Sequence, residues 1–499
     1  MAVEVLINAG VGEIRVATVA DGRLQELSFE RTIGVEAGGA EEGGRGCYSL
    51  VGTVILGRVQ RVMAGMQAAF IDIGLERAGF LALREAKPLA SAPCDDTRIG
   101  ECLREGEAVL VQVIKDPIGE KGARLSAAIT LPGRMLVMTP GQPGLALSRR
   151  IEDPVQRAGL TALGEQMLAE AGDRLPAGTG FIFRTAALGA CLNELAGDAM
   201  QLAETWRCIQ DKRKGARPPA QLYTDLGPVE RTMRDAVRGG IARVLIDDAH
   251  AAESARAYCR KAMPEAEARI ELVNEPVFGL YDLEDEIEKL SHPRVTLPSG
   301  AWITIETTEA LTAIDVNSGR FTRSGGLEET SFAVNLEAAR EIGRQIRLRG
   351  IGGLIVVDFI HLSDAAHVEQ VLTALSESLS FDHAPVQVSP MSEFGIVAIT
   401  RKRVREPLAR LLSGPCPACH GEGRVPSRES VALAILRRVE REARAWPGRE
   451  IHVTAAPEVA AWLDSHADEI RLSLDRRGAG RVRFEAGSCA RSVFDVRPV

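Results

Sequence analysis

The stretch ALTAIDVNSGRF, residues 310–321, decides how the largest α/β segment of this sequence is interpreted. A strand-like apolar run ends abruptly on Asp315, and Asn317 and the small residues Ser318 and Gly319 follow it. Polar residues at the end of a buried strand have two ordinary roles. They accept backbone N–H groups in a turn, or they hold a metal ion.

A helix and a second strand are predicted directly after this stretch. Residues 328–349 carry an apolar stripe with the spacing of one helix face. Its members are Phe332, Leu336, Ala339, Ile342 and Ile346. The segment GIGG, residues 350–353, ends the helix, and the apolar run LIVVD then ends on Asp358. The order strand, helix, strand predicts a right-handed crossover between two parallel strands.

Asp315 and Asp358 would then lie at the same edge of one sheet, where open α/β sheets bind ligands. If the two strands are neighbours, about 5 Å separates them, so both carboxylates can reach one cation. Mg²⁺ suits such a site, because it takes oxygen ligands and often one or two carboxylates plus a substrate phosphate. The pattern predicts metal-dependent phosphotransfer or hydrolysis, and two turn-capping aspartates are the alternative.

Length and composition indicate a soluble protein of several domains. The 499 residues are too many for one core, so we expect three or more domains. Hydrophobic residues make up 45% and charged residues 26%, and no run is long enough to span a membrane. The N-terminus lacks the pattern of a secretory signal. The net charge is -8, and the basic clusters at 149–150, 212–217 and 401–405 are expected to be solvated unless they line a phosphate site.

The nine cysteines are scattered except for Cys416 and Cys419, which favours a reducing cytoplasm over a disulfide framework. This pair has the spacing of a metal knuckle, but structural zinc needs four ligands. His420 or Cys489 could complete the site, or two chains could each donate two thiolates to one Zn²⁺. A redox role is the third reading, although the surrounding pattern is not that of a thioredoxin-type motif.

The order of elements predicts a multidomain α/β and α+β protein. Residues 3–31 read as strands with a hairpin turn at Asp21-Gly22. Residues 50–130 show several short strands, as in a small antiparallel barrel of the OB type. Strands and helices alternate from 131 to 291 and again from 301 to 412, and a smaller helix-strand-helix-strand tail follows the cysteine pair.

The motifs TEALTAIDVNSGRF, NLEAAREIGRQIRLRGIGGLIVVDFI and CPACHGEGRV occur in this order in the chain. MQAAFIDIGLERAGFLAL, SRRIED and GFIFRTAALG precede them. Together they resemble the ribonuclease E/G family over essentially the whole chain, closest to its short, ribonuclease G form. The resemblance implies a cytoplasmic, Mg²⁺-dependent, single-strand-specific endoribonuclease that leaves 5′-phosphate and 3′-hydroxyl ends in rRNA processing and mRNA decay.

The resemblance also implies an architecture. An RNase H-like region is formed by residues 1–47 and 230–291 and is interrupted by an OB-fold RNA-binding domain (48–130) and a 5′-end sensor domain (131–229). A DNase I-like catalytic domain (292–412), a zinc knuckle (413–425) and a small α/β dimerisation domain (426–499) complete it. No segment like the long scaffold tail or the membrane-binding segment of full-length ribonuclease E is expected, which argues against a large degradosome assembly.

The resemblance assigns roles to individual residues. Asp315 and Asp358 bind Mg²⁺, and Asn317 supports them in catalysis. Val137, Arg184 and Thr185 sense the 5′-phosphate, whereas Pro385 replaces a second arginine of that pocket and weakens the expectation of 5′-monophosphate preference. The RNA-contacting positions are Phe70, Phe80 and Lys121. From pattern alone, the two phenylalanines read as core residues.

In the family, Cys416 and Cys419 would bind a structural Zn²⁺ shared between two chains, so we expect a homodimer or homotetramer. Single-stranded RNA, as rRNA precursors and mRNA, is the expected partner. Two alternatives remain: a non-catalytic OB-fold RNA-binding protein, and a metal-dependent DNA nuclease.

Overall fold

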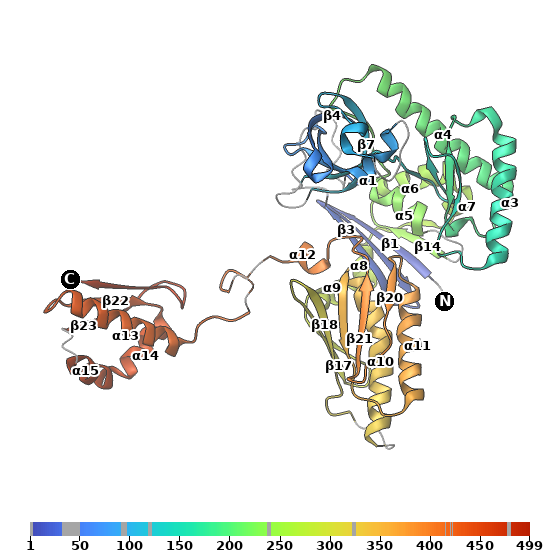
Figure 1. Ribbon diagram of the computed structural model, residues 1–499. Helices are drawn as coiled ribbons and strands as arrows, with labels where there is room; N and C mark the ends of the chain where they lie inside the picture. The colour runs from blue at the N-terminus through green and yellow to red at the C-terminus, as the bar shows by residue number, and fades with distance from the viewer. Residues whose placement is uncertain are drawn as a thin grey trace. The chain divides into compact units, whose positions relative to one another are not determined.

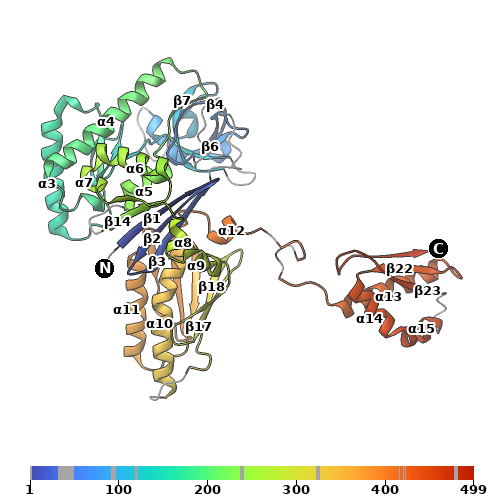
Figure 2. The same ribbon diagram turned by 180° about the vertical axis from the view of Figure 1, so that it is seen from behind.

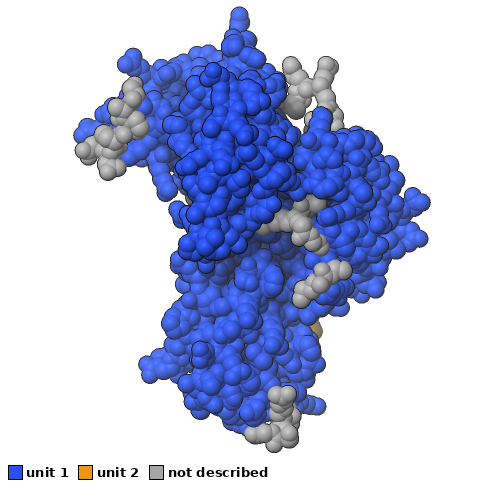
Figure 3. All heavy atoms as spheres, turned by 90° about the vertical axis from the view of Figure 1, so that its right-hand side faces the viewer, with its two compact units in different colours: residues 1–408 blue, residues 409–499 orange. Residues whose placement is uncertain are grey.

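The computed structural model divides into two compact units, residues 1–408 and 409–499 (Figure 1), and the first is blue in Figure 3. It describes residues 3–31, 50–90, 97–117, 122–236, 241–321, 326–414, 416–419, 421, 423–476 and 481–499. No helix within these ranges combines the length and the apolar content that crossing a bilayer requires.

The first sheet joins two segments that lie far apart in the sequence, with the strand order β15-β14-β1-β2-β3 (Figure 1). Its strands are β1 (Val3–Gly10), β2 (Glu13–Ala20), β3 (Arg23–Arg31), β14 (Ile241–Ile246) and β15 (Ile270–Leu272). β1 runs antiparallel to β2 and parallel to β14. The predicted hairpin turn is confirmed, since Asp21 and Gly22 both have positive φ, as a tight hairpin turn requires.

Five helices, α5 to α9, lie before, between and after the strands β14 and β15 in the chain. They are α5 (Pro228–Ala236), α6 (Ala249–Ala262), α7 (Pro264–Glu267), α8 (Val277–Leu280) and α9 (Leu283–Leu290). Val5, Ile7 and Val244 of the sheet share one buried cluster with small residues of α6 such as Ala252 and Ala255. Small side chains let the helix lie close to the strands.

A closed barrel of five strands follows in the chain, which confirms the OB-like expectation. The strands are β4 (Val54–Met63), β5 (Ala68–Asp72), β6 (Gly79–Ala82), β7 (Ala108–Lys115) and β8 (Arg124–Ser126), with the short helices α1 (Leu83–Ala86) and α2 (Ile99–Cys102). β4 pairs with both β5 and β7, which closes the barrel. All barrel pairs are antiparallel except β6–β8, and β13 (Ala220–Tyr223) adds to β4 from outside.

The next layer is a four-stranded sheet of order β11-β12-β10-β9 with two long helices. The elements are β9 (Leu131–Pro132), β10 (Leu136–Thr139), β11 (Gly144–Leu147), β12 (Gly180–Phe183), α3 (Pro154–Ala171) and α4 (Leu192–Gly215). Asp153 caps α3 by accepting the Val155 N–H, and Pro154 occupies the first helical position. Phe181 and Phe183 are fully buried between this sheet and the helices.

A six-stranded sheet completes the first unit, with the order β16-β17-β18-β19-β21-β20. Its elements are β16 (Arg294–Thr296), β17 (Trp302–Thr307), β18 (Leu311–Asn317), β19 (Gly353–Asp358), β20 (Val386–Val388), β21 (Ile396–Arg401), α10 (Leu327–Leu348) and α11 (Ala365–Ser380). The predicted crossover is confirmed, because α10 connects the parallel strands β18 and β19.

Only one face of this sheet is covered by helices among the described elements. α10 and α11 lie side by side along it (Figures 1 and 2), and Ile314, Ile355 and Ile342 belong to the core between them and the strands. Because side chains alternate along a strand, the residues between these buried positions point to the other face. We call this the open face.

The second unit contains its own small core. Its elements are α13 (Arg428–Ala445), β22 (Ile451–Ala455), α14 (Pro457–Ser465), α15 (Ala467–Asp475), β23 (Val482–Ala486) and β24 (Phe494–Pro498), and α12 (Leu408–Leu412) lies at the junction of the units. β22 is the central strand, parallel to β23 and antiparallel to β24. The predicted helix-strand-helix-strand order is correct but lacks one helix and the last strand.

Candidate functional site

Asp315 and Asp358 are direct neighbours across the parallel pair β18–β19. Both side chains lie on the open face and are exposed, while Ile314 and Val357 beside them are buried under the helices. Paired positions of adjacent strands lie about 5 Å apart. The two carboxylates are therefore held next to each other by the main-chain ladder.

Asn317 is tied to this pair. Its Nδ2 donates to Oδ2 of Asp315 at 2.8 Å. The predicted turn follows, with Gly319 at φ +61° and a Phe321 N–H···O=C Ser318 bond of 3.2 Å. Among the residues that the structure describes, the Asp315 carboxylate accepts a hydrogen bond from the Asn317 side chain and none from a backbone N–H.

The chemistry of the pair is that of a hard-cation site. Two carboxylates directly opposite each other repel, and a cation between them would remove that cost. Within the described ranges, no group of three or more His, Cys, Asp or Glu residues is arranged to hold a metal. Two carboxylates are nevertheless sufficient for Mg²⁺ when water and a substrate phosphate supply its other oxygens.

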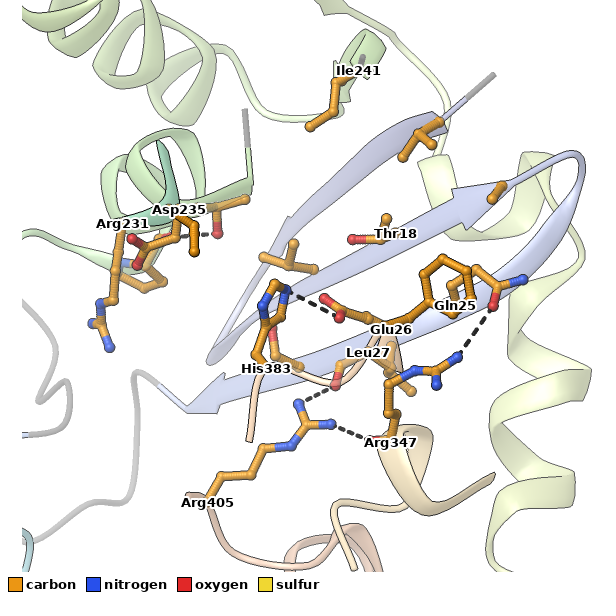
Figure 4. A pocket seen from close by; sticks show the side chains of 18 of the residues that line it. Thr18, Gln25, Glu26, Leu27, Arg231, Asp235, Ile241, Arg347, His383 and Arg405 are labelled. Carbon is orange, nitrogen blue, oxygen red and sulfur yellow. Dashed lines mark hydrogen bonds and ion pairs between the residues drawn. The ribbon is translucent and has the colours of Figure 1, made fainter. Parts of the chain in front are cut away.

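A second site is a cavity of about 1340 Å³ that is lined by residues of β2, β3, α5 and the four-stranded sheet. Figure 4 shows the part of its wall that β2, β3 and α5 form. Val137, Arg184 and Thr185 all line it. They come together because β10 pairs with β12, which places Val137 opposite Ile182 and two residues from Arg184. The structure thus brings the three predicted 5′-phosphate residues into one cavity.

Arg184 is already engaged in this cavity. Its guanidinium donates to the Gly133 carbonyl and to Asp235 Oδ1, each at 2.6 Å. Burial alone would raise the pKa of Asp235, but hydrogen bonds and charge from Arg234 and Arg184 outweigh it and lower that pKa. Asp235 therefore stays ionised and holds the guanidinium at the cavity wall.

His383, two residues before Pro385, lines the same cavity (Figure 4). Its Nε2 lies 3.3 Å from Oε1 of Glu26. Arg150 donates to the backbone carbonyls of Asp382 and His383 and also lines the cavity. The segment around Pro385 is thereby connected to the four-stranded sheet that carries Arg184.

Phe70 and Phe80 pair directly across β5–β6, with ring centroids 5.9 Å apart in an edge-to-face arrangement. Their strand neighbours Ile71 and Leu81 fill the barrel core, so the two rings lie on its outer surface, half buried. The pattern-only expectation that both are core residues is wrong, because the alternation places them on the opposite side of each strand from the core. Lys121 lies outside the described residues.

Comparison with known proteins decides the family. A sequence model described as the ribonuclease E/G family matches residues 130–404. Ribonuclease G of Salmonella typhimurium strain SL1344 is 37% identical over 479 residues, which cover 94% of each chain.

This chain belongs to the ribonuclease E/G family.

Other relatives span the chain to different extents. Ribonuclease G of Haemophilus influenzae is 36% identical over 492 residues, or 95% of this chain and 96% of the relative. Ribonuclease E of Escherichia coli strain K12 is 37% identical over 467 residues, which cover 92% of this chain but 42% of that protein. Among these relatives, this member of the ribonuclease E/G family matches the ribonuclease G proteins over nearly their full length.

A second model, described as the thioredoxin-like domain of RNase E/G, matches residues 415–486 of this family member. The structure places Cys416 and Cys419 in a turn well before α13 begins at Arg428, with no described strand leading into it. Backbone N–H groups of Cys419 and Ala418 and the Cys419 side chain lower the pKa of the Cys416 thiol. Cys489 donates its thiol to the Val493 carbonyl, and His420 lies outside the described residues.

Sequence reasoning missed several cations of these sites. Arg61 and Arg124 are exposed and pair with Phe70 and Phe80, which makes the row Arg61-Phe70-Phe80-Arg124 across the outer barrel surface. The alternation of side chains along each strand could have shown that both arginines point away from the barrel core. Only the pairing register shows that they lie in one row with the two phenylalanines. Arg150 and Arg405 were noted as members of basic clusters, and both line the cavity instead of forming a free solvated surface.

Proposed function

We propose that this protein is a cytoplasmic, Mg²⁺-dependent, single-strand-specific endoribonuclease that acts in rRNA processing and mRNA decay. Its cuts leave 5′-phosphate and 3′-hydroxyl ends. Membership of the ribonuclease E/G family, with relatives named ribonuclease G over 94% of the chain, carries the endoribonuclease activity. The carboxylates of Asp315 and Asp358, paired in register on the open face, support this face as the location of the catalytic site.

Asp315 and Asp358 would hold the Mg²⁺ ion, because their oxygens are adjacent, exposed and of the type this ion takes. When bound, the ion polarises a phosphoryl oxygen and lowers the pKa of a coordinated water. Asn317 uses one N–H to fix the position of the Asp315 carboxylate. Its amide oxygen is then available to accept a hydrogen bond from water or RNA, which is a positioning role.

The row Arg61-Phe70-Phe80-Arg124 supports the barrel as the RNA-binding domain. Aromatic side chains on a barrel surface stack on unpaired bases, and arginines at both ends of the row attract the backbone phosphates. Because the contact is to exposed base faces, it selects single strands over duplexes. Lys121 is proposed as a further phosphate contact on the resemblance alone.

Val137, Arg184 and Thr185 are proposed to receive the 5′-monophosphate in the cavity. A guanidinium and a hydroxyl suit a terminal phosphate, but here the phosphate competes with Asp235 for Arg184. Together with Pro385 in place of a second arginine, this predicts a modest preference for 5′-monophosphorylated RNA.

The domain assignments follow from topology. The order β15-β14-β1-β2-β3, antiparallel in β1–β3 and parallel from β1 through β14 to β15, supports an RNase H-like region from residues 1–47 and 230–291. The mixed sheet with its two helices supports a DNase I-like catalytic domain at 292–412. Residues 131–229 are the proposed 5′-end sensor.

Zinc is proposed to join two chains through Cys416 and Cys419 in the knuckle at 413–425, with 426–499 as the dimerisation domain. The backbone N–H groups around Cys416 stabilise a thiolate, which suits a zinc ligand. Cys416 and Cys419 supply two of the four ligands that a tetrahedral site needs, and, as the family resemblance implies, a second chain related by twofold symmetry would supply the other two. Chelation of zinc and Cys416→Ser should both reduce the mass of the oligomer measured in solution. Cys208→Ser, which removes an exposed thiol on α4, should leave that mass unchanged.

The decisive experiment compares one single-stranded RNA with a 5′-monophosphate or a 5′-triphosphate, with and without Mg²⁺. We expect cleavage only with Mg²⁺ and a small preference for the monophosphate. Asp315→Asn should abolish cleavage but retain RNA binding, whereas Glu309→Gln, an exposed carboxylate at the opposite end of β18, should cleave normally. RNA binding without cleavage by the unaltered protein would instead identify a non-catalytic RNA-binding protein.

A further inference from the structure

A positively charged residue lies in the same row of the open face as the two aspartates. Arg294 of β16 pairs with Thr304 of β17, Thr304 pairs with Asp315, and Asp315 pairs with Asp358. Paired residues of adjacent strands have side chains on the same side of a sheet. Arg294 therefore lies on the open face two strands from Asp315, about 10 Å away at the usual strand spacing.

The guanidinium of Arg294 is held in place without being neutralised. Its Cζ lies 4.0 Å from the centre of the Trp302 ring, the distance of a cation–π contact. The residue is exposed, and among the described residues no carboxylate lies within ion-pair distance of it. Stacking on a ring face uses no N–H donor, so the donors at the edge of the guanidinium remain available to an anion.

Trp302 links this arginine to the carboxylate site. It pairs with Asn317 across β17–β18 and so lies on the open face beside the residue that fixes Asp315. Its ring also packs on the turn after β18, since a Cβ added at Gly319 would lie 2.6 Å from ring atom Cζ3. The same ring thus supports Arg294 on one side and the Asn317 turn on the other.

We propose that Arg294, positioned by Trp302, binds a backbone phosphate of the RNA strand adjacent to the phosphate at Asp315 and Asp358. A bound strand brings several negative charges to a surface that already carries two carboxylates, and Arg294 offsets part of that repulsion. A planar guanidinium with free donors matches a phosphate in geometry as well as in charge. The inference rests on the proposed function and names a substrate contact of the same site.

The test uses Arg294→Gln in the full-length protein, with a short 5′-hydroxyl single-stranded RNA so that the 5′-phosphate cavity is not engaged. Binding is measured in an Asp315→Asn background over a series of salt concentrations. Loss of one phosphate contact should reduce the slope of log affinity against log salt by about 0.7. Cleavage is measured with Arg294→Gln as the single substitution, so that Asp315 is intact. KM should then rise about 5- to 30-fold with kcat nearly retained, because the lost charged hydrogen bond contributes to binding.

Matched variants separate this contact from general charge effects. Arg340→Gln removes an exposed arginine from α10, on the covered side of the same sheet, and should change neither the slope nor KM. Arg294→Lys should keep the salt slope but weaken binding, because lysine lacks the planar stacking geometry. Trp302→Ala should raise KM and lower kcat, while Trp302→Phe, which keeps a ring under the guanidinium, should recover most of both.

Two results would overturn the inference while the proposed function stands. The unaltered protein cleaves the RNA, but Arg294→Gln has the same KM and salt slope as the parent, or Arg340→Gln shows the same change as Arg294→Gln. Absence of Mg²⁺-dependent cleavage by the unaltered protein is a different outcome, which removes the proposed function and the inference with it.

Discussion

The buried ion pair between Asp382 and Arg401 should be the most sensitive electrostatic contact of the six-stranded sheet. Arg401 Nε donates to Asp382 Oδ2 at 2.7 Å and its Nη2 donates to Oδ1 at 3.0 Å, with side chains only 4% and 2% exposed. Each group has one further bond, since Arg401 Nη1 donates to the Ile351 carbonyl and Asp382 accepts the Ala384 N–H. Asp382→Asn would leave the arginine charge buried and unpaired.

The expected loss is about 3–5 kcal/mol of local stability, the cost of removing one partner from a buried, hydrogen-bonded ion pair. At about 1.4 kcal/mol per factor of ten, the lower bound corresponds to a change of more than 100-fold in an opening equilibrium. The double variant Asp382→Leu with Arg401→Met should lose much less, because no unpaired charge then remains.

Hydrogen exchange measured by mass spectrometry can localise this effect. Amides of β21 and β19 should exchange more than 100-fold faster in Asp382→Asn, because Arg401 ends β21 and pairs with Gly353. Peptides of the second unit, such as α13, provide the internal control and should not change. Equal exchange rates in β21 of the parent and of Asp382→Asn would refute the reasoning, and so would a double variant as unstable as the single one.

The same pair predicts a pH dependence. Burial raises the pKa of Asp382, but hydrogen bonds from Arg401 and the Ala384 N–H outweigh it and hold that pKa below its ordinary value. A lowered native pKa contributes stability that is fully present above the unfolded value and is lost as pH falls through the native one. The difference in exchange rate between parent and Asp382→Asn should therefore shrink as pH is lowered from about 4, and a constant difference would contradict this assignment.

Three further changes test other parts of the molecule. Gly343→Ala should destabilise the first unit by about 1–3 kcal/mol in thermal denaturation, because a Cβ there would lie 2.2 Å from a side-chain atom of α11. Gly197→Ala is the control: a Cβ there has open space, so the substitution should be neutral or stabilising in the same assay. Asp235→Asn should release Arg184 and raise the ratio of kcat/KM for 5′-monophosphate over 5′-triphosphate RNA several-fold, and an unchanged ratio would show that the phosphate does not use this arginine. Phe80→Ala should weaken binding of single-stranded RNA by about 10- to 100-fold in fluorescence anisotropy, as expected for one lost stacking contact, and undiminished affinity would contradict the assignment of the barrel surface.

Features that depend on local periodicity and chain order could be predicted from the sequence. The apolar stripe of α10 and the run ending at Asp358 were sufficient to predict the crossover, and the handedness rule then placed Asp315 and Asp358 at one edge. The barrel strands were recognisable for the same reason. The matching of whole motifs to a family supplied Arg184 and Thr185, which no local pattern distinguishes from surface residues.

Features that depend on pairing register could not be predicted. Arg294 reaches the carboxylate row only because β16, β17 and β18 pair with one particular alignment, and a shift by one residue would turn it to the other face. The burial of Asp382 with Arg401 depends on how the segment before β20 packs, which composition does not reveal. Phe70 and Phe80 sit in apolar runs, so only the observed strand orientation shows that they face outward.

The pairing of β1 with β14 has a consequence for how the protein is made on the ribosome. Asn8 and Asp247 are hydrogen-bonded partners separated by 239 residues, so the first sheet cannot be completed until the barrel and the four-stranded sheet have been synthesised. At about 5–20 residues per second, β1 emerges roughly 10 to 50 seconds before its parallel neighbour. During that interval β1 to β3 can form only a three-stranded antiparallel ribbon, in which the edge of β1 that later pairs with β14 is unpaired. Until β14 is available, this edge of β1 is exposed to edge-to-edge association between nascent copies on neighbouring ribosomes.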